Sequence, residues 1–410
     1  MTDATNAKAT RNAVFLVLVA SLGYFVDIYD LVIFSIVRVD SLRAIGIPEI
    51  ALKPQGVYVI NIQMFGLLLG GLIWGIIGDK FGRIRVLFGS ILLYSIANFV
   101  NGLVHDINTY AIVRFIAGIG LAGELGAGIT LVSETLSKEK RGYGTMIVAV
   151  IGLFGAVAAA QVAHLGWRNA YFVGGGLGIV LLLLRLGTFE SGMYKNVAES
   201  NVSKGNVLML FNDRKRFLKY LYCILIGAPL WYVVGVLITQ AKEFGTALGA
   251  PQELKAGAGI MYSYIGIAIG DIFAGLLAQV TKSRKITMLV FLLLSIVSVS
   301  AYLSTKGITS EQFIWLSFFM GCTVGYWATF VTIAAEQFGT NLRSTVTTTV
   351  PNFVRGALIP INTAFDFFAK KHGMISGGYI MMGILTVIAL FSLSQLKETF
   401  SKDLNYVEIS

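Results

Sequence analysis

Long apolar runs recur along almost the whole chain, and they constrain its fold more than any other feature. In windows of about 19 residues there are twelve such runs, centred near residues 25, 67, 94, 122, 152, 178, 229, 268, 294, 323, 356 and 385. A helix that crosses a bilayer needs about 20 predominantly apolar residues. Of the 410 residues, 56% are hydrophobic and only 13% are charged, well below the charged share of a soluble domain. The sequence therefore predicts an all-α integral membrane protein with twelve transmembrane helices.

The basic residues predict how these helices are oriented. The first run is too long for a signal-peptide core and is interpreted as a membrane span. The net charge is +10, but Lys and Arg alternate with the apolar runs and form no single patch, which argues against nucleic-acid binding. With the N-terminus inside, roughly two thirds of the 32 Lys and Arg residues fall in cytoplasmic loops. We expect a multi-pass protein of the cell membrane, the inner membrane in a bacterium, with both termini cytoplasmic.

The chain divides into two halves that resemble each other. A polar interruption gives a six-helix half at 1–187, a cytoplasmic central loop at 188–216 and a second six-helix half at 217–410. At a shift of about 200 residues, Gly75–Arg85 is echoed by Gly275–Lys285, and Ser133–Gly142 by Ala335–Ser344. Repeated halves are typical of alternating-access carriers, which bind solute between them near the bilayer midplane. In the central loop, Asp213–Arg216 is interpreted as a topological anchor.

Two short motifs in the first half resemble those of the major facilitator superfamily. Gly75–Arg85 places a Gly-Asp-Gly spacing in the turn between the second and third spans. Arg114–Gly120 has the pattern Arg, three residues, Gly, one residue, Gly. Glycines permit a tight turn, and Asp79, Arg83 and Arg85 can form a charge network between neighbouring helices. The resemblance implies the superfamily's fold of two pseudo-symmetric six-helix halves.

Spans one to six most resemble the metabolite:proton symporters of that superfamily. Val26–Ser35 is similar to their first span, and Ala122–Ala127 to their Gly-Gly-Glu segment. Lys140–Gly142 and Phe189–Ser191 are similar to their Arg-Gly and Pro-Glu-Ser segments, with Phe in place of Pro. Glu336–Arg343 resembles the Glu-x-Phe-Pro-Thr-x-x-Arg motif of sugar porters, with Gly in place of Pro. These matches imply a secondary transporter and leave its solute open.

The charged residues of the repeated cytoplasmic turns are predicted to gate this carrier. They hold neighbouring helices together through ion pairs and hydrogen bonds. The candidates are Asp79, Gly82, Arg83, Arg85, Glu134, Arg141, Glu336 and Arg343.

Two acids lie within the first apolar run. Asp27 and Asp30 are three residues apart and share one helix face, and an acid at bilayer depth is costly and usually functional. The resemblance implies that a first-span acid opposes Arg114 of span four. We predict Asp30, with Asp27 second, as the proton-binding group; the alternatives are a helix cap and a permanent structural ion pair. Glu124 lies off the Arg114 face and is either a coupling carboxylate or a clasp between helices.

Span eleven carries a polar stripe at helical spacing, formed by Thr348, Asn352, Arg355, Asn362 and Asp366. Such a stripe should face a central cavity and not lipid. Arg355 is the leading candidate for an anionic solute, because its planar fork suits a carboxylate or phosphate. An ion pair between Arg355 and Asp271 of span eight is the alternative. The predicted substrate-binding residues are Arg355, Asn352, Asn362, Tyr24, Gln63, Trp231, Tyr232, Tyr262, Tyr326 and Trp327.

Other chemistries are not supported by the sequence. The three histidines have no metal-ligand spacing, and both cysteines fall within spans. The letters Gly118-x-Gly120-x-x-Gly123 match a dinucleotide fingerprint, but they lie inside an apolar helix without a preceding strand. No nucleotide-binding loop of the Gly-Lys-Ser/Thr type is present. We predict no metal, no cofactor and no enzymatic activity.

The sequence thus predicts a monomeric, proton-coupled importer of a small hydrophilic, perhaps anionic, metabolite, with the solute, protons and the bilayer as its partners. One alternative is a proton-antiport exporter. Such exporters resemble one another at a Gly-Pro-Gly-Gly pattern in span five, and the corresponding segment here, Gly152–Ala160, lacks that pattern. Another alternative is a membrane sensor with a carrier fold. The short tails and the short central loop argue against this alternative. Organic acids, siderophores, sugars, amino acids and nucleosides all stay open, because fold does not fix the ligand.

Overall fold

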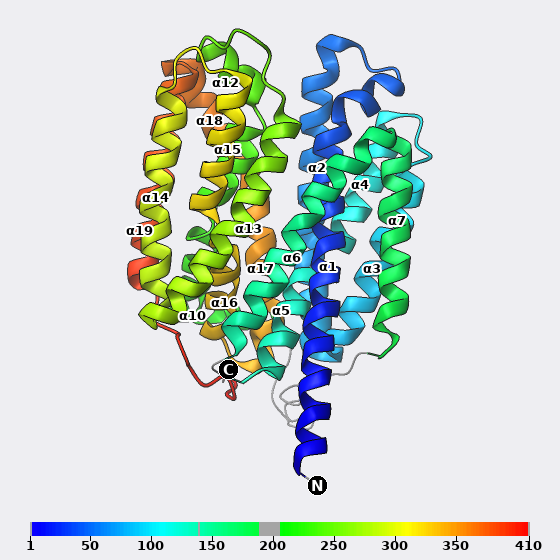
Figure 1. Cartoon of the computed structure of the whole chain (residues 1–410), viewed down its shortest axis with the longest axis vertical. Helices are drawn as coiled ribbons and strands as arrows, with labels where there is room; N and C mark the ends of the chain where they lie inside the picture. Colours follow the sequence, from blue (N-terminus) through cyan, green and yellow to red (C-terminus); the bar gives the residue numbers. More distant parts are fainter. Residues whose placement is uncertain (1, 138–139, 188–205, 409–410) are drawn as a thin grey trace.

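Two helical bundles lie side by side in the computed structural model of the chain, which describes residues 2–137, 140–187 and 206–408 (Figure 1). The first half of the chain, coloured blue to green, forms one bundle, and the second half, green to red, forms the other. Both termini lie at the same end of the molecule, here called the terminal face; the opposite end is called the distal face. The described residues contain helices and no strand.

The first bundle contains seven α-helices that build six membrane-length segments. They are α1 (Thr2–Ala44), α2 (Leu52–Phe81), α3 (Arg83–Asn101), α4 (Ile107–Leu121), α5 (Glu124–Thr135), α6 (Arg141–Val162) and α7 (Trp167–Leu184). Helices α4 and α5 form one segment with a break at Ala122 and Gly123. Short 3-10 turns at Glu49–Ala51, Ala163–Leu165 and Arg185–Gly187 join or end these helices.

Several segments of the second bundle are broken into shorter helices. They are α9 (Met209–Asn212), α10 (Arg214–Leu225), α11 (Ala228–Tyr232), the π-helical η4 (Val233–Ile238), α12 (Ala241–Ala247), α13 (Ala256–Thr281), α14 (Arg284–Ser304), α15 (Ser310–Val324), α16 (Trp327–Gln337), α17 (Thr340–Gly356), α18 (Leu358–His372) and α19 (Met374–Gln395). The predicted central loop 188–216 and the motif Phe189–Ser191 lie largely or wholly outside the described residues.

Eleven helical segments of the described chain are long and apolar enough to cross a membrane. Their positions agree with eleven of the twelve predicted spans. The twelfth is the α17–α18 pair, whose composition is too polar for that criterion. Nearly every residue of α17 is buried, so its polar side chains contact protein instead of the outer surface. Large apolar side chains such as Leu183, Val297 and Val387 cover that outer surface, as a lipid-facing surface requires.

Glycine faces bring the two bundles together near the terminal face. A Cβ atom at Gly75 of α2 would lie 2.8 Å from Cα of Thr345, and one at Gly126 of α5 would lie 2.4 Å from Cα of Thr348. Any side chain at these two positions would push α17 away from the first bundle. This close approach places the polar residues of α17 directly between the two halves.

Candidate functional site

Asp30 and Arg114 form a fully buried ion pair inside the first bundle. Nη1 of Arg114 donates to Oδ1 of Asp30 at 2.9 Å, and Nη2 donates to the Asp30 backbone carbonyl at 3.0 Å. Nε of Arg114 donates to Oε1 of Gln63 at 3.3 Å, and the guanidinium lies 5.6 Å from the centre of the Tyr171 ring. Oδ2 of Asp30 has no hydrogen-bond partner among the described residues. The structure thus brings together three residues that the sequence singled out.

Asp27 lies one helical turn before Asp30 and faces the second bundle. Its Oδ2 is 3.6 Å from Nη2 of Arg355 in α17. Nη1 of Arg355 donates to Oδ1 of Asn352 at 3.2 Å, and Nδ2 of Asn352 donates to the Ala122 carbonyl at 2.9 Å. The Asp27–Arg355 pair therefore connects the two halves of the chain, whereas Asp30–Arg114 lies within one half.

Buried donors without a hydrogen-bond partner surround this connection. Within the described part of the chain, these include Nε and Nη2 of Arg355 and the indole Nε1 atoms of Trp231 and Trp327. The Trp327 ring centre lies 5.6 Å from Cζ of Arg355 and 6.4 Å from the Trp231 ring, in an edge-to-face arrangement. An unsatisfied buried donor costs about 1–3 kcal/mol. A ligand with acceptor oxygens would remove that cost.

A cavity of about 120 Å³ lies between the bundles on the distal side of the Asp27–Arg355 pair. Both halves line it, and Leu31, Trp231 and Leu358 are among its lining residues. Leu31 is one turn beyond Asp27, and Leu358 is three residues beyond Arg355, so the ion pair lies just below the cavity floor. Polar and charged residues of its wall are Ser35, Arg38, Asn61, Thr239, Gln240, Glu243, Asn362 and Asp366.

The predicted aromatic residues do not all lie at this cavity. Tyr24 and Tyr326 are buried, and the hydroxyl of Tyr232 donates to the Gly378 carbonyl at 2.6 Å, which ties it to α19. Tyr264 of α13 lines the cavity, whereas Tyr262 is not among the lining residues. Tyr264 could have been found from the sequence, because it lies two turns before Asp271 and shares its helix face.

Asp271 is not the partner of Arg355. Its Oδ1 accepts the backbone N–H of Ala328 at 3.0 Å, at the first turn of α16. An acid at a helix N-terminus satisfies a backbone donor that has no partner within the helix. The alternative predicted for Asp271, an ion pair with Arg355, is not what the structure shows.

Glu124 belongs to a separate buried cluster. Its carboxylate accepts hydrogen bonds from Arg185 at 3.1 and 2.7 Å and from Oγ of Ser90 at 2.6 Å. A Cβ atom at Gly23 of α1 would lie 1.9 Å from Nη2 of Arg185, so a side chain at this position would force the Arg185 guanidinium to shift. Arg185 was missed in the sequence, where its position at the end of an apolar run suggests only a cytoplasmic anchor.

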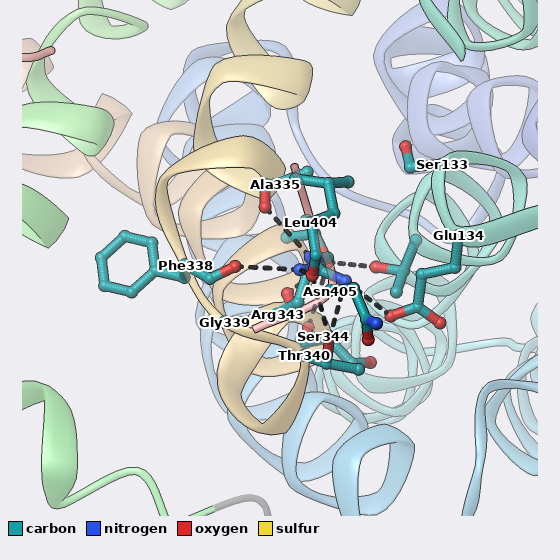
Figure 2. Close-up of polar contacts among 12 residues, drawn as sticks. Ser133, Glu134, Ala335, Phe338, Gly339, Thr340, Arg343, Ser344, Leu404 and Asn405 are labelled. Atoms are coloured by element: carbon teal, nitrogen blue, oxygen red, sulfur yellow. Dashed lines mark hydrogen bonds and ion pairs between the residues drawn. The ribbon is translucent and has the colours of Figure 1, made fainter. Parts of the chain in front are cut away.

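Charged residues of both bundles meet at the terminal face. Oε1 of Glu134 accepts a hydrogen bond from Arg83 of the first bundle at 2.9 Å. It accepts another from Arg343 of the second bundle at 3.1 Å (Figure 2). The Asp79 carboxylate accepts the backbone N–H groups of Ser344 and Thr345 at 3.0 and 2.8 Å. We call Asp79, Arg83, Glu134 and Arg343, which join the two bundles at this face, the terminal gate.

The sequence repeat is also a geometric repeat. Nε of Arg141 donates to the Ser133 carbonyl at 3.2 Å, and Nε of Arg343 donates to the Ala335 carbonyl at the same distance. Likewise, Arg284 and Glu336 of the second bundle are 3.5 Å apart, in the place of Arg83 and Glu134.

Two other predicted gating residues, Gly82 and Arg85, lie beside the terminal gate. Gly82 has a φ of 100°, which turns the chain between α2 and α3 and favours glycine. Arg85 is exposed and lies 5.9 Å from the centre of the Phe81 ring, outside the gate.

Comparison with known proteins identifies the family of this chain. Residues 20–361 match the family model described as Major Facilitator Superfamily. The chain belongs to this superfamily. It is therefore a multi-pass membrane transporter of metabolites and not an enzyme.

Individual relatives share its length and fold. A putative metabolite transport protein of Haemophilus influenzae is 27% identical over 359 residues, which cover 82% of this chain and 84% of the relative. The sialic acid transporter NanX of Escherichia coli is 26% identical over 277 residues, which cover 65% of this chain and 65% of the relative. The solved structure of the proton:xylose symporter XylE superposes with a TM-score of 0.74 over 97% of this chain and 98% of that one, at 16% identity. That last likeness concerns the fold alone.

Proposed function

We propose that this transporter imports a small metabolite bearing a carboxylate, together with a proton. The observation that carries the proposal is the Asp27–Arg355 pair, which joins the two halves just below the cavity floor. A solute carboxylate that enters the cavity finds Arg355, whose planar fork matches two carboxylate oxygens. Arg355 is already opposed by Asp27, so the solute and Asp27 compete for one guanidinium.

Protonation of Asp27 resolves this competition. A neutral Asp27 attracts Arg355 only weakly, which frees the guanidinium for the solute. Conversely, a bound solute carboxylate removes the cation that keeps Asp27 ionised, so proton and solute bind together. Glu124 does not take part in this exchange, because Arg185 neutralises it. Both indole N–H groups near Arg355 can donate to the solute, and the tryptophan rings favour a solute with an apolar or planar part.

The position of the cavity is compatible with the proposed import. The terminal gate is closed, and the cavity lies on the distal side of the site. With the termini in the cytoplasm, as the basic loops predict, this is a state that faces outward. When proton and solute have neutralised Asp27 and Arg355, the charge pair that bridges the halves is lost, and the halves can rock about the site.

Asp30 and Arg114 have a supporting role in this proposal. Their pair lies within the first bundle and cannot report directly on a solute held by the second. It places a compact pair of opposite charges beside Asp27, and the free Oδ2 of Asp30 offers a second proton acceptor. Asp27 therefore ranks above Asp30 as the coupling group, which reverses the order predicted from the resemblance.

The name of one relative supports the carboxylate part of the proposal. NanX is named a sialic acid transporter. Sialic acids carry a carboxylate at neutral pH.

A thermal-shift screen tests the solute class. Purified protein is heated with a panel of small carboxylic acids, each paired with its neutral amide, at two pH values. A true ligand raises the melting temperature by mass action. The proposal expects stabilisation by some carboxylates and by none of their amides, with the effect lost in Arg355→Gln. If the amides raise the melting temperature as much as the acids do, Arg355 does not recognise a carboxylate and the proposal is wrong.

A further inference from the structure

Residues 396–408, which follow α19, lie across the terminal gate; we call them the strap. Nη2 of Arg343 donates to the Leu404 carbonyl at 2.6 Å (Figure 2). The Thr340 backbone N–H donates to the Tyr406 carbonyl at 2.8 Å. From the first bundle, Nη1 of Arg141 donates to the Lys402 carbonyl at 3.2 Å. The side chain of Leu404 is fully buried. One arginine from each half is therefore bound by backbone carbonyls of the same segment.

The start of the strap is fixed by Glu398 at the turn between α13 and α14. Its carboxylate accepts hydrogen bonds from Oγ of Ser283 and from the backbone N–H groups of Arg284 and Lys285. Partial burial raises the pKa of Glu398, but the bonds from Ser283 and the backbone outweigh it and hold that pKa below its usual value. This end is a tight attachment at neutral pH.

The far end of the strap is held by Glu408. Its Oε1 is 3.3 Å from Nζ of Lys219, and its Oε2 is 3.5 Å from Nε of Arg216. Its backbone N–H donates to Oδ1 of Asn341 at 2.8 Å, and its carbonyl accepts from Nδ2 of the same residue at 3.0 Å. The two ion pairs are partly open to solvent, so they are weaker than the buried pairs of the gate.

Glu408 lies in a basic pocket that has room for a larger anion. This pocket, with a volume of about 500 Å³, lies between α10, the end of α16 and the strap. Its charged lining residues are Asp213, Lys215, Arg216, Lys219, Lys397, Lys402 and Glu408. Lys215 and Lys397 are exposed and make no ion pair among the described residues. The single carboxylate of Glu408 thus faces five cations.

The remaining charges of the pocket leave it positive. Burial lowers the pKa of Lys402, and the nearby charge of Lys219 lowers it further, against an opposing effect of Glu408. The carboxylate of Asp213 accepts the backbone N–H of Arg216 at 2.7 Å, which caps α10. A positive pocket at the edge of a membrane helix bundle is the setting in which phosphate groups bind.

We propose that this basic pocket binds a phosphate-bearing anion, which displaces Glu408 from Arg216 and Lys219 and so releases the strap from the terminal gate. A phosphate group presents more oxygens and more negative charge than one carboxylate, and it can also contact Lys215 and Lys397. Displacement of the Glu408 carboxylate leaves the end of the strap held only by the backbone hydrogen bonds of Tyr406 and Glu408 to Thr340 and Asn341, so the strap is bound less tightly over Arg343 and Arg141. The gate opens more readily as a result. The anion is either a soluble phosphate compound or the headgroup of an anionic lipid.

Binding is tested on the full-length purified protein without any solute, so the outcome is independent of the proposed transport function. One arm titrates inorganic pyrophosphate into detergent-solubilised protein and follows the melting temperature. The other compares reconstitution into phosphatidylglycerol and phosphatidylcholine vesicles. The Lys215→Ala/Lys397→Ala variant removes two cations that make no ion pair with a gate or strap residue among the described residues. The matched control, Lys370→Ala/Lys371→Ala, removes two cations from α18.

The readout of strap release is amide hydrogen exchange at residues 404–408. Pyrophosphate, phosphatidylglycerol or both are expected to speed exchange there about tenfold in wild type and in the control, and not in the Lys215→Ala/Lys397→Ala variant. Glu408→Gln is expected to exchange fast without any anion. A response to pyrophosphate alone assigns the pocket to a soluble phosphate, and a response to phosphatidylglycerol alone assigns it to a lipid. No response to either, or the same response in the Lys215→Ala/Lys397→Ala variant, overturns the proposal.

Discussion

Glu134 joins the two halves of the chain at the terminal gate, and Glu134→Gln is predicted to shift the carrier toward opening at that face. One carboxylate oxygen holds Arg83 and Arg343 from opposite halves, at 2.9 and 3.1 Å, with all three side chains fully buried or nearly so. Removing one partner of a buried ion pair typically costs about 3–5 kcal/mol. That cost falls only on the closed state, because in the open state the two arginines separate and meet water.

The expected shift is large. At about 1.4 kcal/mol per tenfold change, a loss of about 3 kcal/mol changes the ratio of open to closed molecules by about a hundredfold. The matched control is Glu336→Gln, its counterpart in the repeat. Glu336 pairs with Arg284 at 3.5 Å within the second bundle, and it attracts Arg141 of the first bundle through its charge without an ion pair within 4 Å among the described residues. The shift in Glu336→Gln should therefore be at most a few-fold.

Spin-label distances across the terminal face measure this ratio. Phe81 of α2 and Val280 of α13 have exposures of 53% and 82%, so cysteine at both positions accepts labels without disturbing the core. We expect a single short distance in the parent and in Glu336→Gln, and a dominant longer one in Glu134→Gln. An unchanged distribution in Glu134→Gln, or an equal change in the control, would refute the assignment of Glu134 to the gate.

Three further predictions concern single positions. Arg355→Lys keeps the charge but loses the planar fork, so the affinity for a carboxylate solute should fall about 10- to 100-fold in thermal-shift titrations while the melting temperature of the free protein changes little. Gly23→Ala forces a methyl group against the Arg185 and Glu124 side chains and should lower the free energy of unfolding by about 1–3 kcal/mol. The control Gly176→Ala, which has open space around it, should leave the free energy of unfolding unchanged, and chemical denaturation measures both. Because the pKa of Glu398 is lowered on folding, its contribution to strap attachment is present at neutral pH and is lost as the pH falls through that lowered pKa. Hydrogen exchange of the Arg284 backbone amide should accelerate in that pH range, and Glu398→Gln should remove this pH dependence.

Hydropathy and internal repetition made much of the fold predictable. Eleven of the twelve spans predicted from apolar windows agree with membrane-length helical segments of the described chain, and the twelfth, centred near residue 356, corresponds to the polar α17–α18 pair. The repeat placed Arg141 and Arg343 in equivalent positions, and both donate to a carbonyl eight residues earlier. Such features depend on local sequence, so a single chain is enough to see them.

Partners across the molecule could not be predicted in the same way. Asp27 and Arg355 are far apart in the sequence, and their meeting depends on how α1 and α17 are rotated about their axes. The same uncertainty in rotation explains why Tyr262 was chosen where Tyr264 lines the cavity, since two residues turn a helix by about 200°. The pairing of Glu124 with Arg185 was missed because Arg185 lies at a span end, where cations are common.

The strap had no recognisable signal at all. Its contacts with Arg141 and Arg343 are made by backbone carbonyls, which every residue has. A short segment without helical or strand periodicity contains no sequence pattern from which its structure can be predicted. The side-chain contacts of the strap, which include Glu398 with Ser283 and Glu408 with Arg216 and Lys219, join residues that are distant in the sequence.

The most direct test of the central claim is a count of protons taken up when a carboxylate solute binds to the purified protein. Calorimetry in buffers of different ionisation enthalpy gives this number for wild type, Asp27→Asn and Asp30→Asn. We predict uptake of about one proton per solute in wild type and in Asp30→Asn, and solute binding without uptake in Asp27→Asn. Undiminished uptake in Asp27→Asn, together with its loss in Asp30→Asn, would contradict the competition between Asp27 and the solute for Arg355.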